Sequence, residues 1–90
     1  MRVRAKVDVN HKAVVSGLRT FGYRALSLAS IGSGCPDILV GGHGKIVLME
    51  VKAQGGKLTE DQEKFIAEWG DLPVFVVRSP EQAIRIMRGM

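Results

Sequence analysis

The chain has 90 residues, of which 46% are hydrophobic and 24% charged, so its composition is that of an ordered globular protein rather than a disordered one. This length suits a single domain over residues 1–90 with one modest core, and it excludes a second domain. The formal net charge of +4 favours a polyanionic partner, the apolar runs are too short to span a membrane, and the N-terminus lacks an apolar signal segment. We therefore expect a cytoplasmic protein with no membrane partner.

The N-terminal segment predicts an arm followed by a helix. In MRVRAKV, basic residues alternate with small or apolar ones and would share one side of an extended arm, unless the segment is a disordered tail. These basic residues are Arg2, Arg4 and Lys6. The next segment, from Asn10 to Phe21, predicts a helix with Asp8 or Asn10 as its N-cap and Gly22 at its end. The apolar face of this helix would consist of Ala13, Val14, Leu18 and Phe21.

Three strands are predicted in the middle of the chain. YRALSLA, residues 23–29, has the composition of a strand, and the glycine-rich SIGSGCP then bends the chain before Asp37. Residues 37–52, DILVGGHGKIVLMEVK, predict two further strands joined through closely spaced glycines as a hairpin.

The C-terminal part predicts two helices around one strand. GGKL is a loop, and Thr59 with Gln62 forms a capping box that opens a helix. The inner face of that helix would be Phe65, Ile66 and Trp69. PVFVV, residues 73–77, is nearly all apolar, as expected for a strand buried on both faces. SPEQAIRIMR, residues 79–88, predicts a last helix capped by Ser79. The order α-β-β-β-α-β-α predicts a compact α/β domain.

Three charged residues interrupt the apolar hairpin. Glu50 and Lys52 are two positions apart at the end of one strand, so they share a sheet face, while Met49 and Val51 take the opposite face toward the core. Asp37 opens the antiparallel neighbour and would come level with Glu50 in the right register. Two carboxylates so placed repel each other unless a divalent cation lies between them. Mg²⁺ suits this position because it needs few protein ligands and also binds substrate phosphate.

These residues suggest a chemistry. A metal-bound water is a better nucleophile at neutral pH, and Lys52 would orient that water or neutralise charge on the phosphorus. This is the chemistry of a phosphodiester hydrolase. The structural alternative is a solvated ion pair between Glu50 and Lys52 at a strand end. The joint occurrence of both acids and the lysine on facing strands favours a site.

The sequence PDILVGGHGKIVLMEVK resembles the PD-(D/E)XK nuclease signature, and the wider pattern G.G.PD…EVK…LT..Q resembles the VRR-NUC branch in its short, stand-alone, phage-type form. The resemblance extends from about Asn10 to the VVRS strand. It implies a restriction-endonuclease-like core with a central mixed sheet flanked by helices, and Mg²⁺- or Mn²⁺-dependent cleavage of DNA. It also implies a homodimer that acts on branched DNA such as a four-way (Holliday) junction, in a bacterial cell or a phage-infected host.

The resemblance assigns roles residue by residue. Asp37 and Glu50 match the metal-binding acids, Lys52 the catalytic lysine, and Gln62 the glutamine on the following helix. The backbone carbonyl of Val51 would add a metal ligand. Gln62 also has a purely structural interpretation, because the capping box alone accounts for it.

The chain departs from the family pattern in two places. Family members often carry an acid in the first helix, where this chain offers Asp8 and Asn10. Asn10 is therefore a candidate additional site residue, and helix capping is its alternative role. The name-giving V-R-R occurs as Val77, Arg78 and Ser79, without the second arginine.

Contacts to DNA phosphates would come from basic side chains. The candidates are Lys12, Lys45, Lys57 and Arg78, within a wider pool that includes Arg2, Arg4, Lys6 and Arg19. The alternative function is a non-catalytic nucleic-acid-binding or assembly module on a nuclease-like scaffold. Two acids facing a DNA phosphate would weaken binding in such a module unless a metal were present, which favours the enzyme.

Overall fold

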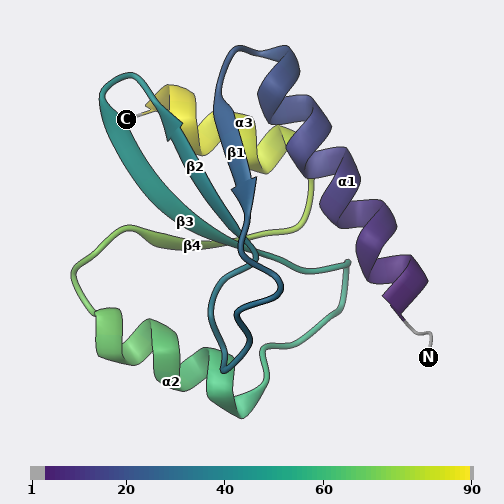
Figure 1. Ribbon diagram of the computed structural model, residues 1–90, viewed down its shortest axis with the longest axis vertical. Helices are drawn as coiled ribbons and strands as arrows, with labels where there is room; N and C mark the ends of the chain where they lie inside the picture. The colour runs from purple at the N-terminus through teal and green to yellow at the C-terminus, as the bar shows by residue number, and fades with distance from the viewer. Residues whose placement is uncertain (1–3, 90) are drawn as a thin grey trace.

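The computed structural model describes residues 4–89, which form a four-stranded mixed sheet and three helices (Figure 1). The elements are α1 (Arg4–Thr20), β1 (Arg24–Ser27), β2 (Ile38–Gly42), β3 (Lys45–Val51), α2 (Glu60–Trp69), β4 (Val74–Val77) and α3 (Pro80–Gly89). This confirms the α/β class and the predicted order of elements. None of the helices within residues 4–89 is both long and apolar enough to cross a membrane.

The first helix begins earlier than predicted. It starts at Arg4 rather than near Asn10, so the prediction of an extended arm or a disordered tail is wrong from Arg4 onward. Arg2 lies outside the described residues. Both Asp8 and Asn10 are inside the helix, and neither is its N-cap. The alternation of basic and small residues suggested an extended chain, but arginine, alanine and lysine are also among the strongest helix formers.

The sheet packs one face against α1 and α3. The buried residues of this core come from both helices and from the strands: Val14, Leu18, Tyr23, Ile38, Val40, Val47, Met49, Val51, Val77, Ala83 and Met87. The predicted apolar face of the first helix is half right. Val14 and Leu18 are fully buried, whereas Ala13 and Phe21 are exposed. Ala13 lies off the buried stripe, and Phe21 follows the end of α1.

The predicted hairpin is present and has the shortest common turn. His43 and Gly44 join β2 to β3 with φ values of 56° and 75°, the left-handed conformations that a two-residue turn of this kind requires. Ile38 pairs with Met49 in the antiparallel ladder. Extending this register by one residue places Asp37 opposite Glu50.

β4 is less buried than predicted for a strand covered on both faces, and it lies at the edge of the sheet. The sheet order is β1-β2-β3-β4, and β4 pairs only with β3, in parallel. Three of its four residues are only half-buried. The apolar composition of VFVV reflects packing on α3 and β3 rather than coverage of both faces.

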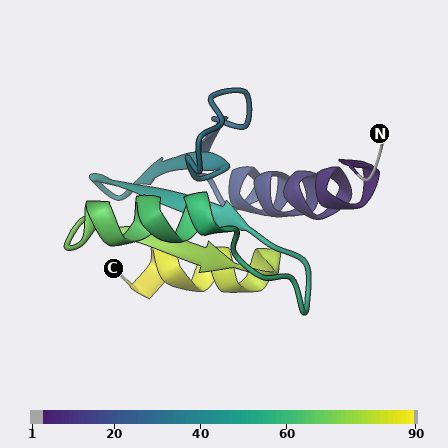
Figure 2. The ribbon, with the colours of Figure 1, turned by 90° about the horizontal axis from the view of Figure 1, so that it is seen from below.

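The second helix is also less buried than predicted. Figure 1 shows α2 set apart from α1 and α3, although α2 and α3 overlap in the view of Figure 2. None of the described residues of α2 is buried. Of the predicted inner face, Phe65 and Ile66 are half-buried and Trp69 is exposed. Phe65 and Trp69 instead stack on each other with their ring centroids 4.8 Å apart.

Candidate active site

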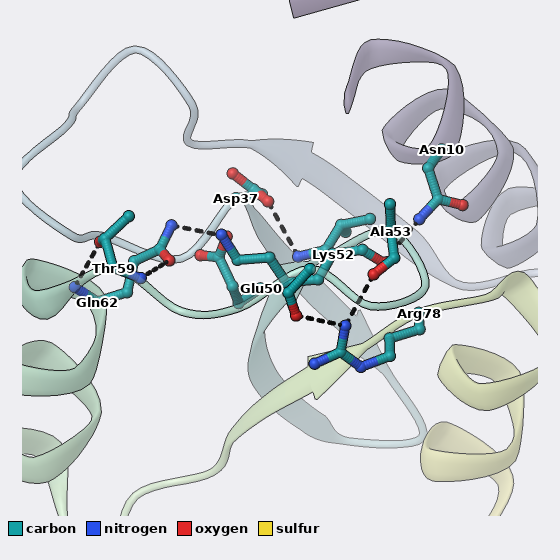
Figure 3. Close-up of polar contacts among 10 residues, drawn as sticks. Asn10, Asp37, Glu50, Lys52, Ala53, Thr59, Gln62 and Arg78 are labelled. Carbon is teal, nitrogen blue, oxygen red and sulfur yellow. Dashed lines mark hydrogen bonds and ion pairs between the residues drawn. The ribbon is translucent and has the colours of Figure 1, made fainter. Parts of the chain in front are cut away.

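The charged residues singled out in the sequence meet at one end of the sheet (Figure 3). Asp37 directly precedes β2, Glu50 is the penultimate residue of β3, and Lys52 follows that strand. The backbone N–H of Val51 donates to Oδ2 of Asp37 over 2.9 Å. This bond holds the Asp37 carboxylate against the end of β3, beside the neighbouring Glu50.

Glu50 is a buried acid with incomplete hydrogen bonding. Its exposed fraction is 3%. Nε2 of Gln62 donates to Oε2 of Glu50 over 3.0 Å, and Nζ of Lys52 lies 3.9 Å from the same oxygen. Oε1 of Glu50 is buried without a hydrogen-bond partner among the described residues. A buried carboxylate oxygen without a donor is unfavourable, so this atom needs a proton, a water or a cation.

The surroundings of Glu50 favour its neutral form. Burial, followed by the charge of the neighbouring Asp37, raises the pKa of Glu50 to about 8 against the opposing effect of Lys52. Without a metal, the Glu50 carboxyl therefore retains its proton at pH 7. The same region affects Cys35: burial, followed by the charges of Glu50 and Asp37, raises the pKa of its thiol. Cys35 is thus a poor nucleophile.

Gln62 forms the predicted cap and also contacts Glu50. Its backbone N–H donates to Oγ1 of Thr59, and its side-chain Oε1 accepts from the Thr59 N–H, which confirms the capping box. Its Nε2 is left to bind Glu50. The helix cap therefore fixes the side chain that reaches into the site.

The backbone that follows β3 is held from two sides. Nδ2 of Asn10 donates to the carbonyl of Lys52 over 2.9 Å. Nη1 of Arg78 donates to the carbonyls of Ala53 and Gly56, over 2.7 and 2.8 Å (Figure 3). Sequence spacing gave no signal for these contacts, because the partners are 42, 25 and 22 residues apart. Asn10 and Arg78 thus position the chain around Lys52, rather than capping α1 or presenting a free strand-end charge.

The three lysines predicted to contact DNA occupy different places. Lys12 is exposed on α1, and Lys57 is exposed in the loop between β3 and α2. Lys45 begins β3, five residues before Glu50, so it lies roughly 17 Å away at the other end of the strand. The structure therefore does not bring Lys45 to the acids.

Gly34 brings the loop before β2 to the start of α2. Its φ is +81°, and a Cβ at this position would overlap the backbone carbonyl of Asp61. The sequence predicts that the glycine-rich SIGSGCP, which contains Gly34, bends the chain before Asp37. The structure shows a turn and a close approach to α2. Through this contact, Asp37 and Gln62 arrive at the same end of the sheet.

The residues present suit a divalent cation of the hard type. Among the side chains that the structure describes, no three His, Cys, Asp or Glu residues cluster, so the candidate side-chain ligands are the carboxylates of Asp37 and Glu50. Mg²⁺ is bound in many sites through one or two carboxylates, with water and substrate phosphate completing its shell. The unpartnered Oε1 of Glu50 and the raised pKa of this carboxyl are both relieved by a cation.

Comparison with known proteins yields no family model, no curated protein and no solved structure that matches this chain.

Proposed function

We propose that this protein is a metal-dependent endodeoxyribonuclease with a core of the PD-(D/E)XK type. The observation that carries the proposal is Glu50, a buried acid with one unpartnered oxygen, placed beside Asp37 and Lys52. A buried acid of this kind lowers the stability of a fold, so its presence indicates a functional role. Its surroundings match those expected of an acid that binds a cation.

Asp37 and Glu50 would hold Mg²⁺ or Mn²⁺, with the backbone carbonyl of Val51 as a further ligand. When bound, the ion supplies Lewis-acid activation of a water and stabilises charge on the phosphate and the leaving oxygen. The N–H of Val51 orients the Asp37 carboxylate, and Gln62 fixes the Glu50 carboxyl. Both acids are therefore preorganised by hydrogen bonds before any ligand arrives.

Lys52 is the proposed catalytic cation. Its ammonium lies 3.9 Å from Glu50, and Asn10 fixes its backbone carbonyl. At this position the charge of Lys52 orients the attacking water or offsets the negative charge that develops on the phosphate. Gln62 completes the proposed catalytic set by holding Glu50.

The proposed substrate is DNA, in particular branched DNA such as a four-way junction, cut by a homodimer in the cytoplasm of a bacterial cell or a phage-infected host. Two symmetric cuts in a junction require two active sites, and two-fold dimers are the commonest oligomers. Leu26 and Ile46 are 59% and 65% exposed on the sheet face opposite the core. This apolar surface suits contact with a second copy. A monomeric mass in light scattering would contradict the dimer.

The decisive experiment is cleavage of labelled four-way junction, flap, single-stranded and linear duplex DNA in Mg²⁺, Mn²⁺ or EDTA. Wild type is compared with Lys52→Ala and with a matched control, Lys64→Ala, which changes an exposed lysine on α2. We expect metal-dependent cutting that Lys52→Ala abolishes while DNA binding persists, and that Lys64→Ala retains. Residual cutting by Lys52→Ala would point to another site or a contaminant.

The second candidate function is a non-catalytic nucleic-acid-binding module. One observation favours it: Glu50 is buried, which raises its pKa, so a metal-free site repels phosphate less. DNA binding without cutting in either metal would select this function.

A further inference from the structure

A basic groove runs along α1 and β1, outside the acid site. It has a volume of about 580 Å³. Its lining consists of His11, Lys12, Val15, Ser16, Arg19, Thr20 and Ser27. Six of these seven side chains are basic or carry a hydroxyl, and none of the described lining residues is acidic. Through its described lining residues, the groove therefore offers hydrogen-bond donors and positive charge.

The groove ends beside the candidate active site. Ser27 is the last residue of β1 and pairs with Ile38, the residue after Asp37. The N–H of Leu28, next to Ser27, donates to the backbone carbonyl of Asp37 over 2.7 Å. On the helix, His11 follows Asn10, which binds the carbonyl of Lys52. Figure 1 shows α1 lying alongside β1, so a ligand in the groove would lead toward the acids.

The chemistry and length of the groove fit a sugar-phosphate backbone. Hydroxyl groups and cations are the side chains that most often contact DNA phosphates. Nη2 of Arg19 donates to the carbonyl of Ala25 over 2.9 Å, which anchors this guanidinium between helix and strand. From His11 to Arg19, α1 rises by roughly 12 Å. That length matches about three to four nucleotides of one strand, at an axial rise of about 3.4 Å each.

A second pocket that also contains basic residues fits a polyanion less well. The pocket between the end of α1 and α3 also contains two arginines, but Glu81 and Phe21 share its lining. The groove along α1 and β1 is thus the better match for a polyanion.

We propose that this groove binds the phosphate backbone of the DNA strand that enters the active site. The proposal rests on the proposed nuclease function for its substrate and adds a binding track formed by α1 and β1. Lys12, which is exposed on α1 and lines the groove, is its main phosphate contact.

The test is fluorescence anisotropy of labelled four-way junction DNA with the whole chain in EDTA, measured over a series of salt concentrations. Lys12→Gln should reduce the slope of log affinity against log salt by about 1, and lower the affinity about five-fold at 0.15 M salt. Lys12→Arg should restore both values. The matched control is Arg88→Gln, an equal charge change at an exposed residue of α3, which should leave the slope at the wild-type value.

The outcomes separate this proposal from the nuclease function. Equal slopes for wild type, Lys12→Gln and Arg88→Gln would overturn the proposal that the groove binds DNA, even if the protein cuts DNA. A slope that falls only in Lys12→Gln supports the groove even if no metal produces cutting. Absence of DNA binding by wild type overturns it as well. Thermal melting of each variant verifies that the comparison is between folded proteins.

Discussion

Gln62 connects the cap of α2 to the buried acid Glu50. Its Nε2 donates to Oε2 of Glu50 over 3.0 Å, while its Oε1 accepts from the N–H of Thr59 over 2.8 Å. Both ends of one amide are therefore engaged, and the side chain has little freedom to rotate. The helix that packs least well in the fold is attached to the sheet at the site by this residue.

Gln62→Ala should lower both stability and cleavage, whereas Thr59→Ala should lower stability alone. Thr59→Ala removes one capping bond and costs about 1 kcal/mol. Gln62→Ala removes the return bond and leaves Glu50 without its amide donor, at a total cost of about 2 to 3 kcal/mol. Urea unfolding measures the stabilities, and single-turnover cleavage measures the rates. Equal rate losses in the two variants would show that Gln62 acts only as a cap.

Glu50 should make the metal-free protein less stable as the pH rises. Its pKa is about 8 in the folded state against 4.5 for the ordinary group. Between these values the folded protein holds a proton that the unfolded chain has lost, so stability falls from about pH 4.5 to pH 8 and then levels off. Glu50→Gln keeps an acceptor for Gln62 and removes the titration.

Glu50→Gln should therefore be more stable than wild type by about 2 to 4 kcal/mol at pH 9, with little difference at pH 4. Urea unfolding in EDTA across this pH range measures the effect. Glu68→Gln, at an exposed position of α2, is the control and should leave the pH profile parallel to that of wild type. A wild-type profile that rises between pH 5 and 8 would refute the assignment of a buried neutral acid.

The local features that the sequence predicted correctly depend on short-range chemistry. Strand alternation and the tight turn at His43 and Gly44 determine the hairpin register, and that register brings Asp37 level with Glu50. The cap of α2 likewise follows from Thr59 and Gln62 alone. The three charged residues could be placed together because the hairpin that joins them covers only about fifteen residues.

The features that were missed depend on tertiary placement. The exposure of Phe21 and Trp69 reflects where α1 ends and where α2 lies, which periodicity does not determine. The contacts of Asn10 and Arg78 with the chain after β3 join distant segments. No local pattern specifies such contacts, because they arise only when α1 and β4 flank β3.

Metal binding should stabilise the folded protein more at high pH than at low pH. Since the Glu50 carboxyl must lose its proton to bind a cation, apparent affinity should fall about tenfold per pH unit below a pKa of about 8. A metal concentration of 100 Kd adds about 2.7 kcal/mol to the free energy of unfolding. Thermal melting with Mn²⁺ or EDTA at pH 6 and 8.5 measures this, and Asp37→Asn should remove the difference. A metal-induced shift that is equal at both pH values would contradict the proposed ligand.

Arg78→Ala should loosen the loop after β3. The variant loses two hydrogen bonds, to the carbonyls of Ala53 and Gly56, so amide hydrogen exchange over residues 53–57 should accelerate and cleavage should slow. Arg85→Ala, at an exposed position of α3, provides the control. A DNA phosphate contact by Arg78 would give a different result: a salt slope smaller by about 1, with loop exchange unchanged.

Gly34→Ala should separate the loop before β2 from α2, and Gly32→Ala gives its matched control. Both glycines have left-handed φ values, +81° and +75°, so an alanine at either position carries a similar backbone strain of about 1 kcal/mol. Only at Gly34 would the new Cβ overlap the backbone of Asp61, while no described atom lies within 4 Å of a Cβ at Gly32. The difference in unfolding free energy between the two variants therefore isolates the contact with α2.

We expect Gly34→Ala to be the less stable by about 1 to 3 kcal/mol and to cut DNA more slowly, because displacing α2 withdraws Gln62 from Glu50. Equal stability of the two variants would mean that the loop and α2 separate without cost, and that Gln62 reaches Glu50 without this support.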